Sequence, residues 1–99
     1  MQEVDNDFYK RADEHIDLSN NQITDEIGKG KVSSSFMFSV ARFNSWVSAC
    51  GWRSASEMAE SKEETIDYFV EEYRRMLEEN MDDYITNFEK YMQINEENA

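Results

Sequence analysis

The residues best placed to do chemistry are four acids that follow one another closely, Glu78, Glu79, Asp82 and Asp83. On a helix, Glu78 lies beside Asp82 and Glu79 beside Asp83, and each like-charged pair costs the helix about 0.2–0.5 kcal/mol. The cluster has two interpretations. It is a surface that docks a basic partner or loosely holds a divalent cation, or it is a solvated face that serves solubility or pairs with Arg42 and Arg53. A helix–loop–helix calcium site is excluded, because its alternating acids and central glycine are absent.

A second group lies on the most apolar segment, where Arg42 and Asn44 flank Phe43 and Trp46 follows Arg42 by one turn. This arrangement fits an anion or partner contact, or a cation–π pair with the tryptophan. The interpretation that we favour is a structural ion pair between Arg42 and a carboxylate of the C-terminal helix.

The remaining reactive residue types lack the partners that catalysis or metal binding needs. His15 has no Glu-x-x-His pairing of the kind that di-iron bundles use. Cys50 is the single cysteine and has no matching histidine, so we expect a small buried side chain rather than a nucleophile. The sequence therefore predicts no catalytic residue, no metal ligand and no cofactor, and a protein that is not an enzyme.

Helices must position these residues, because apolar side chains recur at spacings of three and four and no proline interrupts the chain. Three long helices are predicted, over residues 7–27, 34–50 and 62–92, with a helical turn near 54–59. Gly28 is expected to end the first helix in the left-handed conformation, and one of the serines 33–35 to begin the second. A capping box of Ser61 and Glu64 is expected to begin the third.

These elements predict an all-α fold, a three-helix antiparallel bundle with a long C-terminal helix. The helical domain covers residues 7–92, between a disordered start at 1–6 and a frayed tail at 93–99. The final third of the long helix is apolar through Tyr84, Phe88 and Tyr91, and it extends beyond what two shorter helices can cover. An exposed apolar patch of this kind is typical of an interface.

Two features of the long helix leave alternatives open. Asn80 and Asn87 interrupt its apolar stripe, either to fix the register between helices or where the helix leaves the core and meets water. The uncovered end indicates a homodimer, but a kink near Asn80 that folds the end back, or cover from the first helix, would give a monomer.

Charge limits the classes of partner. The chain of 99 residues has a net charge of −12. Residues 57–99 hold fourteen acids and four bases, whereas residues 28–56 hold no acid and four bases. This balance opposes direct nucleic-acid binding and favours basic partners. No signal segment or membrane-length apolar run is present, and a single cysteine fits a reducing compartment, so we expect a cytoplasmic protein.

Two blocks of the sequence, Ala41-Arg42-Phe43-Asn44 and the stretch from Tyr73 to Tyr84, resemble a bacterial family catalogued as domain of unknown function 3144. The resemblance covers about residues 7–92. It implies a short, acidic, helical protein of bacterial cytoplasm, and it implies no reaction, cofactor or catalytic residue.

The function that the sequence favours is a non-enzymatic protein–protein interaction module. Its binding surface would be the apolar and acidic faces of the third helix, and its partner an unidentified protein, basic in one version and a second copy in another. The alternative is an acidic mimic of nucleic acid that binds a basic regulator or nuclease. A small metal-binding or enzymatic bundle is the least favoured hypothesis.

Overall fold

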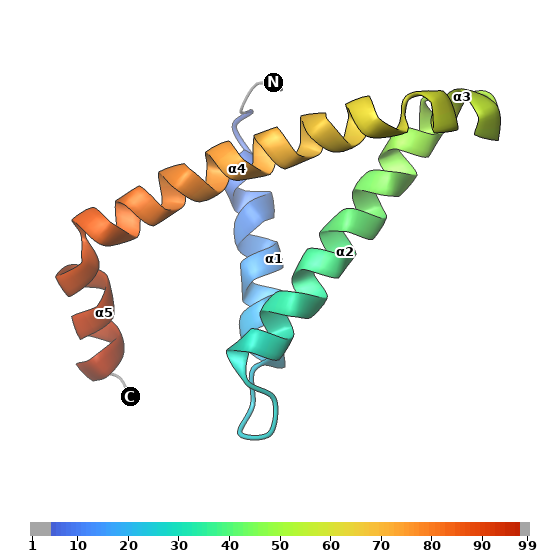
Figure 1. Cartoon of the computed structure of the whole chain (residues 1–99). Helices are drawn as coiled ribbons and strands as arrows, with labels where there is room; N and C mark the ends of the chain where they lie inside the picture. The colour runs from blue at the N-terminus through green and yellow to red at the C-terminus, as the bar shows by residue number, and fades with distance from the viewer. Residues whose placement is uncertain (1–4, 98–99) are drawn as a thin grey trace. The chain divides into compact units, whose positions relative to one another are not determined.

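The computed structural model describes residues 5–97, with side chains over residues 5–93, and this part of the chain is helical without strands (Figure 1). The helices are α1 (Phe8–Gln22), α2 (Lys29–Cys50), α3 (Ala55–Glu60), α4 (Lys62–Thr86) and α5 (Phe88–Glu97). Three of them are long, and α4 is the longest, which confirms the predicted all-α fold of three main helices with a long C-terminal helix. The expected disorder at residues 1–6 falls largely outside the described residues, whereas α5 continues through residues 93–97, where we expected fraying.

The chain divides into two compact units, Met1–Met58 and Ala59–Ala99, and each is described by itself. In the first unit α1 and α2 run in opposite directions from a short turn (Figure 1). Near this turn lies Val32, which is 5% exposed and is the one buried side chain among the described residues. One helical turn further along α2, Phe36 lies against His15 of α1, with ring centroids 6.2 Å apart. The contact between α1 and α2 is therefore built on the first turns of α2.

The turn between α1 and α2 starts earlier than the sequence pattern indicates. α1 ends at Gln22, not at Ile27, because Ile23 takes an extended backbone with φ −78° and ψ 123°. The Thr24 Oγ1 then accepts hydrogen bonds from the N–H of Glu26 at 3.2 Å and of Ile27 at 3.0 Å. A threonine hydroxyl that bonds the backbone in this way competes with the helix, so the apolar spacing of Ile23 and Ile27 is not a helical face.

Our predictions for the start of α2 were wrong. Gly28 does not end a helix in the left-handed conformation: its φ is −77° and ψ 164°, and it is the N-cap of α2. Residues 28–31, which lie between the two predicted helices, consequently form the start of α2, with Val32 N–H donating to the Gly28 carbonyl oxygen at 3.3 Å. None of the serines 33–35 begins the helix. The predicted end of α2 at Cys50 is correct.

Side chains cap the start of α3 rather than of α4, in a variant of the capping box in which the glutamate bonds the residue before the cap. The Ser54 Oγ accepts a hydrogen bond from the Glu57 N–H at 3.2 Å, and the Glu57 carboxylate accepts one from the Arg53 N–H at 2.8 Å. This exchange between side chains and free backbone donors is what starts a helix. At Ser61, the predicted location, no side chain caps α4. The predicted turn near residues 54–59 is confirmed as α3.

The long helix is not continuous to Met92, and the kink that we considered at Asn80 lies seven residues later. α4 ends at Thr86, because Asn87 departs from helical geometry with φ −110° and ψ 25°, and α5 begins at Phe88. The second unit thus consists of α4 and α5, joined at a single asparagine (Figure 1). Among the described helices, none combines the length and the apolar character that a membrane span requires.

The burial of Val32 leads to the first prediction. Val32→Ala removes two buried methyl groups, and we expect a loss of about 1–2 kcal/mol in the free energy of unfolding. Val47→Ala makes the same change on α2 at a side chain that is 45% exposed. We expect that control to cost less than about 0.5 kcal/mol. Urea unfolding followed by circular dichroism measures both, and equal losses would contradict the assignment of Val32 as the contact that joins α1 to α2.

Candidate functional site: the acidic helix α4 and the turn that ends it

α4 separates apolar from acidic residues around its circumference. Positions that alternate by four and three residues form one face, which we term the apolar stripe: Ile66, Val70, Tyr73, Leu77 and Tyr84. These side chains are 42–57% exposed, and no residue of α4 is buried. The nine acids of α4 lie mostly on the opposite side, against three bases. The helix therefore presents an apolar face and an acidic face to solvent.

The four clustered acids have different surroundings. Glu78 lies 3.8 Å from the Arg74 guanidinium, an exposed pair of little energetic weight. Glu79 and Asp82 are exposed and make no ion pair with another described residue. Asp83 is engaged by residues beyond the helix end. The cluster is thus three solvent-facing acids and one structural acid.

Asp83 holds the junction between α4 and α5, which we term the Asp83 clasp. The Asn87 Nδ2 donates hydrogen bonds to the Asp83 carbonyl oxygen at 3.0 Å and to its Oδ1 at 2.9 Å. The Tyr91 hydroxyl donates to Asp83 Oδ2 at 3.1 Å. The Tyr91 ring also lies 4.9 Å from the Tyr84 ring, centroid to centroid. These contacts explain why the helix is interrupted at Asn87: its side chain bonds the preceding turn, and the clasp fixes α5 after the interruption.

The residues predicted to form an interface at the end of the long helix differ in exposure. Tyr84 is 53% exposed and Phe88 59%, as an interface would require. Tyr91 is half-buried by its contacts in the Asp83 clasp. Asn80, like Asn87, donates to the backbone of its own helix, here to the Met76 carbonyl oxygen at 2.7 Å. The amide of Asn80 is exposed, which favours a helix face in contact with water over a buried amide that sets register.

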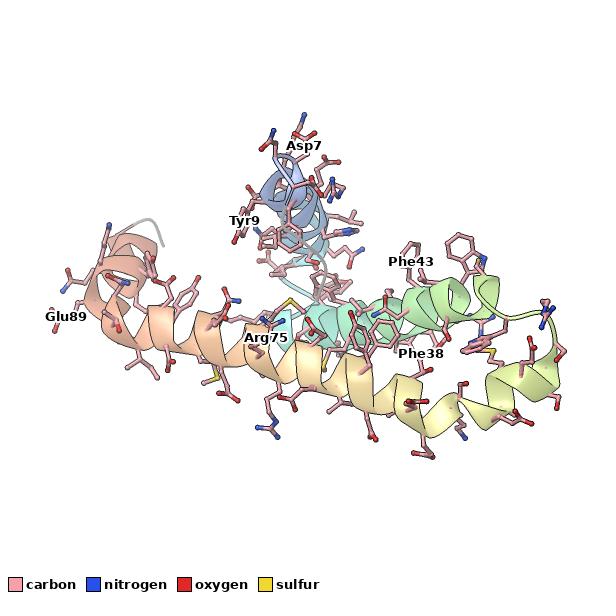
Figure 2. The ribbon with its side chains drawn as sticks, turned by 90° about the horizontal axis from the view of Figure 1, so that it is seen from above. Asp7, Tyr9, Phe38, Phe43, Arg75 and Glu89 are labelled. Carbon is pink, nitrogen blue, oxygen red and sulfur yellow. The ribbon has the colours of Figure 1, made fainter. Side chains whose placement is uncertain are left out.

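The Arg42 group lies on α2, in the first unit. Arg42 is exposed and forms part of an open hollow whose wall includes Phe38, Phe43 and Trp46. The Phe43 and Trp46 rings are in contact at 5.5 Å, and Figure 2 shows Phe38 and Phe43 projecting from α2. Asn44 is half-buried outside this hollow. The structural ion pair of Arg42 with a carboxylate of the long helix stays a prediction.

Other reactive residues do not converge. Cys50, the last residue of α2, is exposed, so the expectation of a buried cysteine was wrong. Over the described residues, no three His, Cys, Asp or Glu side chains come close enough to hold a metal ion. Two local pairs were not predicted from the sequence: Asp5 with Arg11 at 2.8 Å, and the Ser54–Glu57 cap. The spacing of Ser54 and Glu57 was a readable signal, whereas Asp5 and Arg11 lie six residues apart and follow no helical rule.

These features define an all-α protein whose largest organised surface is an exposed, amphipathic, acidic helix. The chain belongs to the family of proteins of unknown function DUF3144, which matches residues 8–85. It is also similar to a solved structure, the NMR structure of the protein NB7890A from Shewanella sp.. The two sequences are 40% identical over 94% of this chain and 98% of that one, with a TM-score of 0.77. No curated protein matches the chain.

The Asp83 clasp leads to a pH prediction. The hydrogen bond to the Asp83 carboxylate raises the pKa of the Tyr91 phenol above its ordinary value of 10.0. A raised pKa means that the clasp stabilises the fold fully below pH 10 and loses that contribution as pH rises through the folded-state pKa. Ultraviolet titration of the tyrosines should therefore show one phenol ionising above its ordinary range.

Two variants test whether the phenol that ionises at high pH is that of Tyr91. In Tyr91→Phe the high-pH component should disappear, and in Asp83→Ala it should move back toward 10.0, the ordinary value. Tyr68→Phe, on an exposed side of α4, is the control and should leave the component in place. A high-pH component that survives in Tyr91→Phe would show that the clasp does not form.

Proposed function

We propose that this chain is a non-enzymatic protein–protein interaction module whose binding element is α4. The observation that carries the proposal is the apolar stripe, which stays exposed along a helix of 25 residues with acids on its other side. An amphipathic helix of this kind binds by placing its apolar face in a groove of the partner, with anchors about one turn apart. The acids at the rim then select a partner with basic residues around that groove.

This chemistry defines the class of the partner and not its identity. It is a protein with an apolar groove and a basic rim, and a second copy of the chain is one version of it. The binding surface we propose consists of the apolar stripe with Phe88, and of Glu78, Glu79 and Asp82 beside it. We place the interaction in the cytoplasm, because one cysteine and no disulfide suit a reducing compartment.

Mimicry of nucleic acid is the second proposal, and it has weaker support. A mimic needs a continuous row of negative charge that competes for a basic groove. Here Arg74 lies 3.8 Å from Glu78 and Arg75 lies 2.6 Å from Glu72, so bases interrupt the acidic side in the middle of α4. The apolar stripe also has no role in a purely electrostatic complex.

Affinity capture from the native bacterium, with mass spectrometry, tests the binding element. Leu77→Ser polarises the centre of the apolar stripe at a side chain that is 43% exposed. We expect it to reduce the captured partner at least about tenfold, as truncation of a central apolar anchor does. Leu18→Ser is the matched control on α1, where the leucine is 58% exposed. If Leu77→Ser retains the partner as the control does, the apolar stripe is not the binding surface.

The acids are tested in the same capture. The triple variant Glu78→Gln, Glu79→Gln, Asp82→Asn leaves the Asp83 clasp intact, and it should weaken capture and reduce its salt dependence. A control of equal charge, Asp13→Asn, Glu14→Gln, Asp17→Asn, changes α1 instead. Equal capture by both triples would make the α4 acids a solvated face. A partner lost in the α4 triple but kept in Leu77→Ser would favour mimicry.

A further inference from the structure

The α2 helix carries a second organised surface, opposite in charge to α4. Its centre is Arg42, and aromatic side chains lie one turn before it, at Phe38, and one turn after it, at Trp46. Phe38 is 71% exposed and Trp46 61%. Small residues, Ser45 and Ala49, leave space between the large ones, and Phe43 closes one side, so the surface is an open hollow along the helix. We term it the α2 hollow.

The α2 hollow does not belong to the contact between α1 and α2. Val32 and Phe36, which make that contact, fall on one side of α2 at spacings of four. At 100° per residue, Arg42 lies about a quarter of a turn from the middle of that side and Trp46 about a sixth, whereas Phe43 lies on the same side further along the helix. The hollow therefore lies beyond the contact along α2 and is centred on a neighbouring face.

The dimensions of the α2 hollow fit a helix. Residues 38–49 extend about 17 Å along α2 at 1.5 Å per residue, which is three helical turns. Large residues alternating with small ones along this length form the ridges and grooves into which the side chains of another helix insert. A helical occupant would place about three anchors, one per turn, in the hollow.

Charge selects the kind of helix. α2 contains no acid, and Arg42 is the charged residue in the lining of the hollow; the other two bases of the helix, Lys29 and Lys31, lie about three turns or more before Arg42. Arg42 is flanked by aromatic side chains on both sides, where an approaching carboxylate is partly desolvated and its hydrogen bonds to a guanidinium are strengthened. Arginine and tryptophan together are also the residues that most often dominate binding energy in interfaces.

From this geometry we infer that the α2 hollow is a docking site for an acidic, amphipathic helix, which sets apolar side chains between Phe38 and Trp46 and a carboxylate on Arg42. The site is distinct from the binding element proposed on α4. It would make the chain a connector with two surfaces of opposite charge. A synthetic peptide with the sequence of residues 62–86 has the required chemistry, a net charge of −6 and an apolar stripe, and serves as the probe.

The experiment uses the full chain with Trp52→Phe, so that Trp46 is the single tryptophan. Before peptide is added, acrylamide should quench Trp46 readily, as an exposed indole requires. Adding the peptide should shift the emission to the blue and protect it from quenching, in a saturable way that weakens as salt increases. A scrambled peptide of identical composition keeps the charge and loses the apolar stripe, and it should not bind.

Variants then test the residues. Arg42→Gln should weaken peptide binding about tenfold, whereas Arg53→Gln, which removes an exposed arginine outside the hollow, should not change it. Ser45→Glu, which places an acid inside the hollow, should abolish binding. Circular dichroism checks that each variant keeps its helices.

Four results would overturn this inference. Trp46 could be protected from acrylamide before any peptide is added, which would mean that the chain itself covers the hollow. If that protection increases with protein concentration, a second copy of the chain covers it. The scrambled peptide could bind equally well, or Arg42→Gln and Ser45→Glu could bind as the parent does. Finally, a basic or neutral amphipathic peptide could bind as tightly as the acidic one. Leu77→Ser leaves the α2 hollow unchanged and should still bind the peptide, so failure here is distinguishable from failure of the function proposed for α4.

Discussion

The rest of the structure depends on how little apolar surface its helices bury against one another. A helix in water is marginal unless an apolar face packs on something, and most helical stability in proteins comes from that packing. Among the described residues Val32 alone is buried, and the apolar stripe of α4 stays open to solvent. The large side chains are present, with six phenylalanines, five tyrosines and two tryptophans, so the material for a core exists. Most of these side chains are instead exposed, and apolar patches of this kind are typical of interaction surfaces.

Charge divides these faces into two kinds. α2 carries bases and no acid, whereas α4 carries nine acids and three bases. Apolar faces alone would bind one another without discrimination, and opposite charges at their rims restrict the partners that each accepts. The segregation along the sequence, with an acid-free stretch over 28–56 before an acidic end, therefore has a structural meaning: α2 is a helix without acids, and α4 carries an excess of them.

The sequence predicts the main helices because their apolar spacing is long and regular, and it fails where one side chain bonds the backbone. Thr24 stops α1 although Ile23 and Ile27 continue its pattern, and Asn87 stops α4 although Tyr91 continues the stripe. Such side-chain bonds depend on a rotamer, which periodicity does not report. The candidate site could likewise be predicted only in part. Residue spacing predicts the apolar and acidic faces of α4, whereas the role of Asp83 depends on its contacts with Asn87 and Tyr91 after the end of the helix.

The Asp83 clasp also determines where the binding surface that we propose on α4 ends. Because Asp83 accepts hydrogen bonds from Asn87 and Tyr91, it is committed to the junction and is a poor choice for contact with a partner. Tyr91 is committed in the same way, although its position in the stripe suggested an interface residue. What remains for a partner on α4 is the stretch from Ile66 to Tyr84, about 27 Å long at 1.5 Å per residue, and Phe88 adds to it from the far side of the junction. An interrupted helix thus gives a shorter binding surface than a continuous one, and it has a defined end, since a groove that recognises α4 must terminate or turn at Asn87.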